Sequence, residues 1–183
     1  MKDTDIESSL NIISRNYGRI DQLVKDLFYS NKPEQKDFKK INLAETMEEV
    51  LETASDRISL NGICLEKNFE KDCIISADVK SLKIGLLNII VNAIEAMVKN
   101  KGRLHVCVSR QDKTIVLAIR DNGCGMSQEE TARMFEPYYS KKPSGLGVGL
   151  TNVQTILKNH HARPEVKSEP GEGTLFIIFF DSA

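Results

Sequence analysis

The sequence predicts an α+β fold: a two-layer α/β sandwich preceded by one long N-terminal helix. Residues 103–109 and 113–120 alternate apolar and polar side chains, which predicts two neighbouring strands with one face on a core. Residues 79–99 and 148–160 carry apolar side chains at helical spacing before and after these strands. Antiparallel strands with segregated helices are typical of an α+β sandwich, whereas a doubly wound sheet alternates strand and helix.

The N-terminal residues 4–30 form the clearest helical pattern. Thr4 followed by Glu7 is a capping-box signature for its start. Apolar residues then recur at spacings of four and three: Ile6, Leu10, Ile13, Tyr17, Ile20, Val24 and Leu27. Such an a/d seam needs partner helices. We expect a dimerising helical bundle, and a terminal helix lying on the domain behind it is the alternative.

The remaining chain divides into a linker and a run of short elements. Residues 31–40 are polar and contain one proline, so they are interpreted as a linker between residues 1–30 and a domain over residues 41–183. Asn42 followed by Glu45 predicts a helix over 43–57 that faces inward with Leu43, Met47, Val50, Leu51 and Ala54. Further strands are predicted at 63–69, 73–76, 164–168 and 174–180, and residues 121–147 are loop-rich.

The composition excludes several classes of function. The 183 residues have a formal net charge of −1, which gives no basic footprint for nucleic acid or an anionic membrane. The four cysteines form no C-x-x-C pair, which fits neither a zinc site nor a disulfide framework and favours a reducing cytosol. No apolar run approaches the roughly 18–20 residues that span a bilayer. We expect a cytoplasmic chain, compatible with the cytoplasmic part of a larger membrane-bound sensor.

The predicted helix over 79–99 contains the stretch LLNIIVNAIEAM, in which polar residues interrupt a core pattern. Asn88, Asn92 and Glu95 follow the spacing i, i+4, i+7 and therefore share one face. A buried amide without a partner costs about 1–3 kcal/mol. The stripe therefore needs a partner outside the apolar core.

Two glycine clusters follow. After the strand KTIVLAIR comes DNGCGM, where Asp121 at a strand end precedes Gly123 and Gly125; a close backbone approach to a ligand and a plain turn both fit. Asp121 could accept a hydrogen bond from an exocyclic amine such as the N6 of adenine. SGLGVGL precedes a helical pattern whose free N-terminal amides suit a phosphate, and it matches neither the dinucleotide nor the Walker A motif.

Two further stretches are weaker indications by themselves. Lys141 and Lys142 lie between the clusters in FEPYYSKK, where they could reach phosphates when a mobile lid closes or could simply be solvated. Thr174 follows Gly173 before the last strand, where a threonine is often only a turn or strand residue.

Taken in this order, LLNIIVNAIEAM, DNGCGM, FEPYYSKK, GLGVGL and GEGT resemble the ATP-binding fold shared by sensor histidine kinases, gyrase and mismatch-repair ATPases, the Bergerat fold. The closest resemblance is to the catalytic domain of two-component sensor histidine kinases, over about residues 40–181. The stretch RNYGRIDQLVKDLFYS resembles the second helix of the kinase dimerisation and histidine-phosphotransfer domain. The resemblance implies that the first helix of that domain is absent from this chain.

The resemblance also implies roles for individual residues. Asn92 would bind the Mg²⁺ that bridges the ATP phosphates, and Asn88 would support the metal or the phosphates. Asp121 would read the adenine amino group, with Gly123, Gly125 and, through water, Thr174 beside it. Phe135 would anchor the lid and Lys142 would face the phosphates. The backbone that would wrap the phosphates is formed by Gly145, Leu146, Gly147, Val148, Gly149 and Leu150.

Position 88 separates two branches of this superfamily. The resemblance implies that the hydrolysing ATPases carry a water-activating Glu there, whereas Asn88 cannot take a proton. We therefore expect phosphotransfer rather than hydrolysis, with Asn88, Asn92 and Lys142 as the catalytic residues. Glu95, one turn further along, is interpreted as a salt-bridging residue or one that supports the site from behind.

The chain lacks an obvious phosphate acceptor. His105 lies in a predicted strand, and His160 and His161 close a helix, where a cation favours the helix dipole. None lies on the N-terminal seam, so we expect the acceptor histidine on a dimerisation-domain segment outside this chain.

The predicted function is therefore the Mg·ATP-binding catalytic domain of a sensor histidine kinase. Its expected partners are a second copy bound through the N-terminal helix, a dimerisation domain with the acceptor histidine, and a response regulator. A serine kinase of the anti-sigma-factor type on the same fold and a non-catalytic nucleotide-binding scaffold are the alternatives. The histidine kinase would form an acid-labile phosphohistidine, whereas the serine kinase would form an acid-stable phosphoserine. Transfer of phosphate from labelled ATP would distinguish the kinase from the non-catalytic scaffold.

Overall fold

A computed structural model describes residues 37–140 and 147–183, and the predicted N-terminal helix, its proposed dimerisation role and most of the predicted linker lie outside these residues. The described residues belong to one compact unit, Lys36–Ala183. In these ranges no helix is both long and apolar enough to cross a bilayer.

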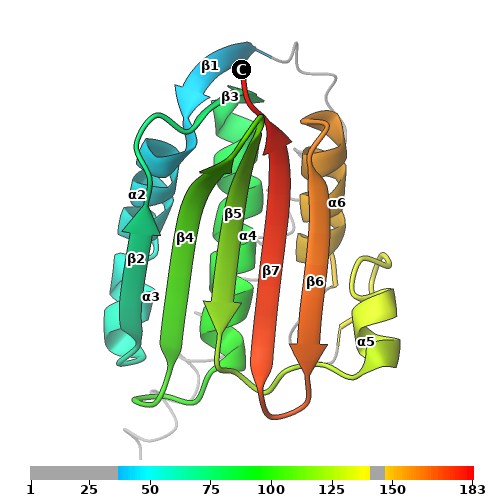
Figure 1. Ribbon diagram of the computed structural model, residues 1–183. Helices are drawn as coiled ribbons and strands as arrows, with labels where there is room; N and C mark the ends of the chain where they lie inside the picture. Colours follow the sequence, from blue (N-terminus) through cyan, green and yellow to red (C-terminus); the bar gives the residue numbers. More distant parts are fainter. Residues whose placement is uncertain (1–36, 141–146) are drawn as a thin grey trace, which may run out of the picture. The chain divides into compact units, whose positions relative to one another are not determined.

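A five-stranded sheet forms one layer of the domain (Figure 1). Its strand order is β2-β4-β5-β7-β6, with β2 Cys64–Phe69, β4 Arg103–Gln111, β5 Thr114–Asp121, β7 Gly173–Asp181 and β6 Arg163–Glu169. Apolar residues on one face of β4 and β5 are buried as predicted: Leu104, Val106, Val108, Ile115, Leu117 and Ile119. The predicted two-layer sandwich is thereby confirmed.

Helices α2 (Leu43–Thr53), α4 (Val79–Ala96) and α6 (Gly149–Asn159) form the second layer and cover one face of the sheet. Asn42 caps α2 by accepting the N–H of Ala44 at Oδ1 (3.0 Å), and Asp78 caps α4 by accepting the N–H of Ser81 (2.9 Å). Each cap satisfies a helix N–H that has no partner within the helix. The inward-facing residues predicted for α2 are all buried.

The first strand and the first helix differ from the prediction. Residues 38–40, assigned to the linker, instead begin β1 (Phe38–Asn42), which pairs antiparallel with β3 (Ile74–Asp78) in a separate two-stranded sheet. The helix predicted over 43–57 is broken at the buried Ala54, after which α3 (Ser55–Leu60) begins. Ile58 of α3 is buried in the core, four residues after the buried Ala54.

Two further differences have identifiable causes. β2 pairs parallel with β4, because β3 and α4 form a crossover between them, and the sheet is therefore mixed rather than purely antiparallel. Residues predicted as loop contain α5 (Gln128–Arg133), which starts with a capping box: the Ser127 hydroxyl accepts the Glu130 N–H, and the Glu130 carboxylate accepts the Ser127 N–H. The capping-box signature S-x-x-E is visible in the sequence at Ser127 and Glu130.

Candidate functional site

The candidate site lies where the C-terminal half of α4, the end of β5 and the start of α6 meet. Gly85 of α4 packs against Ile156 of α6: a Cβ on Gly85 would lie 3.2 Å from Ile156 Cγ2. This close approach of the two helices is possible because glycine has no side chain. One turn further along α4, the Asn88 side chain lies 4.0 Å from the Cβ position of Gly149, the first residue of α6. Asn88 therefore faces the N-terminus of α6.

Asn88 and Asn92 keep their side-chain amides available. Both are half-buried, and within the described residues neither side chain forms a hydrogen bond. No side-chain polar atom that is fully buried in this part of the chain lacks a partner, so these two amides must still be reached by solvent. They are in place to bind a polar ligand without first breaking an internal contact.

The third polar residue of the stripe, Glu95, has a structural contact. Its carboxylate lies 4.0 Å from Arg57 Nη1 of α3, and both side chains are largely exposed. The interpretation of Glu95 as a salt-bridging residue is therefore confirmed. An exposed ion pair of this kind contributes about 0–1 kcal/mol to the stability of the fold.

Asp121 ends β5 and is the buried carboxylate of the site. Only 6% of its surface is exposed. Burial raises the pKa of Asp121, and this effect outweighs the opposing hydrogen bonds from the backbone N–H groups of Gly123 (2.8 Å) and Thr174. A buried carboxyl group with a raised pKa is a candidate functional residue.

Three glycines allow close backbone contacts around the end of β5. A Cβ on Gly123 would lie 2.7 Å from Ala96 Cβ, and the neighbouring Cys124 N–H donates to the Ala96 carbonyl (3.0 Å). Gly125 has φ +64°, and its Cβ would lie 1.9 Å from the carbonyl oxygen of Glu169. Gly173 has φ +91°, and its Cβ would lie 2.1 Å from the carbonyl oxygen of Asp121. The DNG sequence is therefore more than a turn, because its glycines allow contacts between α4, the β5–α5 loop and the β6–β7 turn.

Thr174 is the register partner of Asp121, and Ser168 on β6 is the register partner of Thr174. The Ser168 hydroxyl lies 2.9 Å from Thr174 Oγ1 and accepts the Met126 N–H at 2.8 Å. Sequence reasoning identified Thr174 and missed Ser168. The pairing of position 168 with 174 across the predicted closing hairpin was the signal that could have found it.

The two ends of the predicted lid meet beside this site. Phe135 is half-buried and packs edge-on against Phe176, with ring centroids 6.2 Å apart. The Tyr138 N–H donates to the Gly147 carbonyl (3.1 Å), and a Cβ on Gly147 (φ +68°) would lie 2.4 Å from the Tyr138 backbone. Phe135 and Gly147 therefore lie at the two bases of the lid. Lys142, Gly145 and Leu146 lie outside the described residues.

The remaining residues of the second glycine cluster begin α6. Val148 is the N-cap residue, Gly149 is the first helical residue, and Leu150 packs against the core. The Val148 side chain makes no cap hydrogen bond, so the N–H groups of this first turn are not satisfied by a side chain there. Their ligand-binding role stays a prediction.

The histidines differ in their surroundings. His105 is exposed on β4. His160 is buried, with Nδ1 2.8 Å from the Ile156 carbonyl oxygen and Nε2 3.1 Å from the Asp78 nitrogen and 3.3 Å from the Asp78 carbonyl oxygen. The expected cationic role of His160 at the helix end stays a prediction. Among the described residues no group of three histidine, cysteine or acidic side chains is placed to hold a metal.

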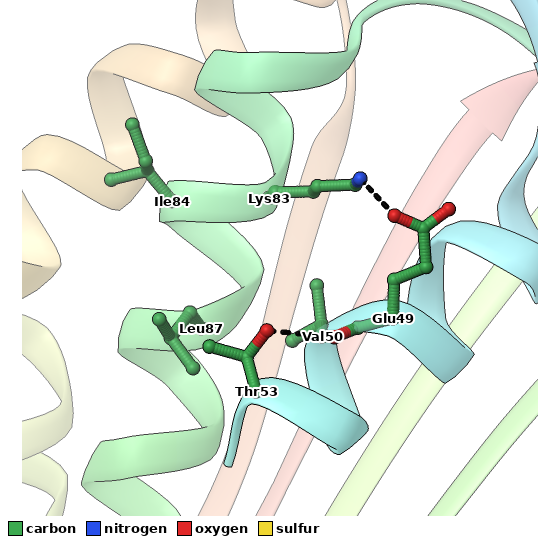
Figure 2. A pocket seen from close by; sticks show the side chains of 6 residues that line it. All are labelled: Glu49, Val50, Thr53, Lys83, Ile84 and Leu87. Atoms are coloured by element: carbon green, nitrogen blue, oxygen red, sulfur yellow. Dashed lines mark hydrogen bonds and ion pairs between the residues drawn. The ribbon is translucent and has the colours of Figure 1, made fainter.

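A second hollow lies away from the candidate site, between α2 and α4 (Figure 2). Its volume is about 150 Å³, and it is lined by Glu49, Val50, Thr53, Lys83, Ile84 and Leu87. Figure 2 shows the ion pair between Lys83 and Glu49 on one side of it. It contains none of the predicted site residues.

Comparison with known proteins identifies the family of this chain. Residues 77–183 match the family described as histidine kinase-, DNA gyrase B-, and HSP90-like ATPases. Sporulation kinase C of Bacillus subtilis (strain 168) is 34% identical over 95% of this chain and 41% of its own length. Sensor histidine kinase ZraS of Klebsiella oxytoca is 30% identical over 92% of this chain and 37% of its own length. The chain thus spans well under half of these curated relatives.

Solved structures agree at the level of the fold. The catalytic domain of histidine kinase ThkA has a TM-score of 0.73 at 24% identity, over 80% of this chain and 96% of that one. A crystal structure of ThkA in complex with the response regulator protein TrrA has a TM-score of 0.81 at 22% identity, over 97% of this chain and 52% of that one. The described unit has the fold of a histidine kinase catalytic domain, and the chain belongs to the family of histidine kinase-, DNA gyrase B-, and HSP90-like ATPases.

Proposed function

We propose that this chain binds Mg·ATP and acts as the catalytic domain of a sensor histidine kinase. Asp121 is the observation that carries the proposal. It is a buried carboxyl group at the end of β5 whose hydrogen-bond donors within the described residues are backbone N–H groups, so its remaining lone pairs are available to the amino group of adenine.

The phosphates would lie between α4 and the start of α6. Asn88 and Asn92 have free amides on the α4 side, and the first turn of α6 offers backbone N–H groups opposite them. Amide oxygens are hard ligands that suit Mg²⁺ when phosphates and water complete the shell, so Asn92, supported by Asn88, fits as the metal ligand. When bound, the ion would neutralise charge on the transferring phosphoryl group. Lys142 is predicted to add a positive charge from the lid.

The chain's own residues favour transfer over hydrolysis. Asn88 cannot accept a proton from water, and no carboxylate stands in its position. In the proposed transfer, a histidine nitrogen of a dimerisation domain forms the new N–P bond while the bond from the γ-phosphorus to ADP breaks. Catalysis would then depend on positioning and charge neutralisation.

The partners follow from this role. ThkA has been crystallised with a response regulator protein, and this chain would likewise serve such a partner in two-component signalling. We also propose a homodimer formed through residues 1–30, and a cytoplasmic location, which the composition favours.

Nucleotide titration tests the ATP site. Isothermal calorimetry with Mg·ATP should show binding to the wild type and a loss of at least about tenfold in Asp121→Ala, because a buried hydrogen bond to a charged group is worth about 1.5–3 kcal/mol. Asp181→Ala is the matched control: Asp181 is exposed and lies at the opposite end of the sheet, so its affinity should be unchanged. Absence of binding to the wild type, or equal affinities in the two variants, would refute the site.

Transfer of labelled phosphate tests the reaction. Incubated with labelled ATP and a histidine-bearing dimerisation domain supplied in trans, the chain should produce an acid-labile phosphoprotein. An acid-stable product would indicate a serine kinase instead. Binding of ATP without transfer to any supplied acceptor would favour the nucleotide-binding scaffold.

A further inference from the structure

Three polar side chains form a row across the sheet at the candidate adenine site. Asp121 of β5 pairs in register with Thr174 of β7, and Thr174 pairs with Ser168 of β6. Side chains two residues along each strand lie on the same face. Those neighbours are Ile119, Phe176 and Val166, which belong to or pack against the core under the helices. The row therefore faces the helical layer, on the side where α4 carries Asn88 and Asn92.

Ser168 makes three polar contacts at this point. Its Oγ accepts the Met126 N–H (2.8 Å), lies 2.9 Å from the Gly173 carbonyl oxygen, and lies 2.9 Å from Thr174 Oγ1. Met126 follows the DNGCG loop, so this hydroxyl joins the loop below the predicted adenine site to the β6–β7 hairpin. Ser168 is only partly exposed, and so is Thr174.

One assignment of protons satisfies all three contacts. A serine hydroxyl has one proton and two lone pairs. The Met126 N–H can only donate, so it occupies one lone pair of Ser168. The Gly173 carbonyl can only accept, so the Ser168 proton must point to it. The contact with Thr174 is then a hydrogen bond only if the Thr174 hydroxyl donates its own proton to the second lone pair of Ser168.

With its proton donated to Ser168, the Thr174 hydroxyl can act toward a ligand only as a hydrogen-bond acceptor. Asp121 beside it is also an acceptor when ionised. A group facing both residues must therefore be a donor, as the 6-amino group of adenine is and the 6-oxo group of hypoxanthine or guanine is not. A bridging water gives the same result. It donates one hydrogen bond to Asp121 and one to Thr174, so it can only accept a hydrogen bond from the base.

We infer that Ser168 is a positioning residue that makes the site select a purine with an amino group at position 6. It acts by holding the Thr174 hydroxyl as an acceptor, without contact with the nucleotide. The inference rests on the ATP binding proposed above. Without Ser168, the Thr174 hydroxyl could turn and donate to a 6-oxo group, directly or through water, and the discrimination would weaken.

The test compares Mg·ATP with Mg·ITP, which carries the same sugar and phosphates and differs only at positions 6 and 1 of the base. Calorimetry should show that the wild type prefers ATP. In Ser168→Ala the ratio of the two dissociation constants should fall about three- to tenfold, the effect of one net hydrogen bond. Ser168→Thr keeps the hydroxyl and should keep the wild-type ratio. Ser109→Ala, a half-buried serine on the opposite face of β4, is the matched control and should also keep it.

If Ser168 has only a structural role, both nucleotides will bind more weakly to Ser168→Ala by the same factor. The ratio of their dissociation constants will then be unchanged, and this result overturns the inference.

The variant Thr174→Val covers the case in which Ser168→Ala does not fold. It removes the hydroxyl that Ser168 orients while the contacts of Ser168 to Met126 and Gly173 can persist, and the ratio should fall similarly; an unchanged ratio again overturns the inference. A wild type that binds no ATP refutes the proposed function together with the inference, whereas a wild type that prefers ATP beside variants with unchanged ratios refutes the inference alone.

Discussion

Two carboxylates of this domain occupy environments with opposite effects on their charge. Burial outweighs two backbone hydrogen bonds at Asp121 and raises its pKa. At Asp78, burial acts in the same direction, but N–H donors from Ser81 and Asp37 and the hydroxyl of Ser81 together lower the pKa. Asp78 is a helix cap whose charge its surroundings stabilise. Burial disfavours the charged form of Asp121, which is a reason to seek a use for this carboxyl group in binding.

The raised pKa of Asp121 predicts a pH dependence of nucleotide binding. Its folded-state pKa exceeds the unfolded value, so its protonation stabilises the fold at low pH, and that contribution is lost as pH rises through the folded pKa. Adenine needs the ionised form as an acceptor. Preference for ATP over ITP should therefore fall as pH is lowered through the raised pKa, at a higher pH than an exposed aspartate would give.

Calorimetry of both nucleotides between about pH 8 and pH 4 measures this, since the shared triphosphate cancels in the ratio. In Asp181→Ala the profile should match the wild type, and in Asp121→Asn it should disappear. A preference that stays constant down to about pH 4, the ordinary pKa of aspartate, would contradict a raised pKa at Asp121.

Gly125 and Gly171 form a matched pair for measuring the close approach at the site. Both have positive φ, +64° and +85°, so alanine at either position carries a similar backbone strain of about 1 kcal/mol. Only at Gly125 would the new Cβ also meet an atom, the Glu169 carbonyl oxygen at 1.9 Å, whereas nothing lies within 4 Å at Gly171. Gly125→Ala should lower the free energy of unfolding by about 1–3 kcal/mol more than Gly171→Ala. Urea unfolding checks this, and equal losses in the two variants would show that the backbone contact is unimportant.

At the scale of elements, His160 connects three of them. It follows α6, its Nε2 lies beside the Asp78 N–H at the start of α4, and its ring centroid lies 5.0 Å from that of Phe38 in β1. β1 is where the chain enters the domain, and α6 is the helix that follows the predicted lid. One buried imidazole thus joins β1 to α6, the helix whose first turn is proposed to bind the phosphates.

Replacement of His160 should therefore destabilise the domain. His160→Ala removes two buried hydrogen bonds and a ring contact, and should lower the free energy of unfolding by about 2–4 kcal/mol. His161→Asn is the control, because His161 is exposed with φ +53°, a conformation that asparagine tolerates, and it should change stability by less than about 0.5 kcal/mol. Similar unfolding midpoints in urea for the two variants would contradict the role given to His160.

The elements also show where local patterns stop being informative. Alternation placed β4 and β5 well, because each has one face on the core and period 2 records that directly. The parallel pairing of β2 with β4 was not predicted, because it depends on which strand lies beside β2 in the sheet rather than on neighbouring residues, and nothing in the structure explains the break at Ala54. The missed α5 is different, since its capping box is local and could have been recognised.

On the scale of the whole molecule, the candidate site combines segments that are far apart in the chain. Asn88, Asp121, Phe135, Gly149 and Thr174 come from separate motifs, and the order of these motifs was sufficient to indicate the family. Residues 1–36 and 141–146 lie outside the described structure, so the dimerisation helix and the phosphate-facing role of Lys142 stay predictions.

The sequence by itself determined the fold class, the family and the types of residue proposed to bind a nucleotide, because local periodicity and short motifs are sufficient to indicate them. Only the tertiary structure decided which polar groups have partners. The fold leaves the side-chain amides of Asn88 and Asn92 available. It buries Asp121, which raises the pKa of this carboxyl group, and it places the hydroxyl of Ser168 beside that of Thr174. Hydrogen-bond satisfaction and desolvation depend on every neighbour in space, and the neighbours of these residues come from strands and helices that are distant along the chain.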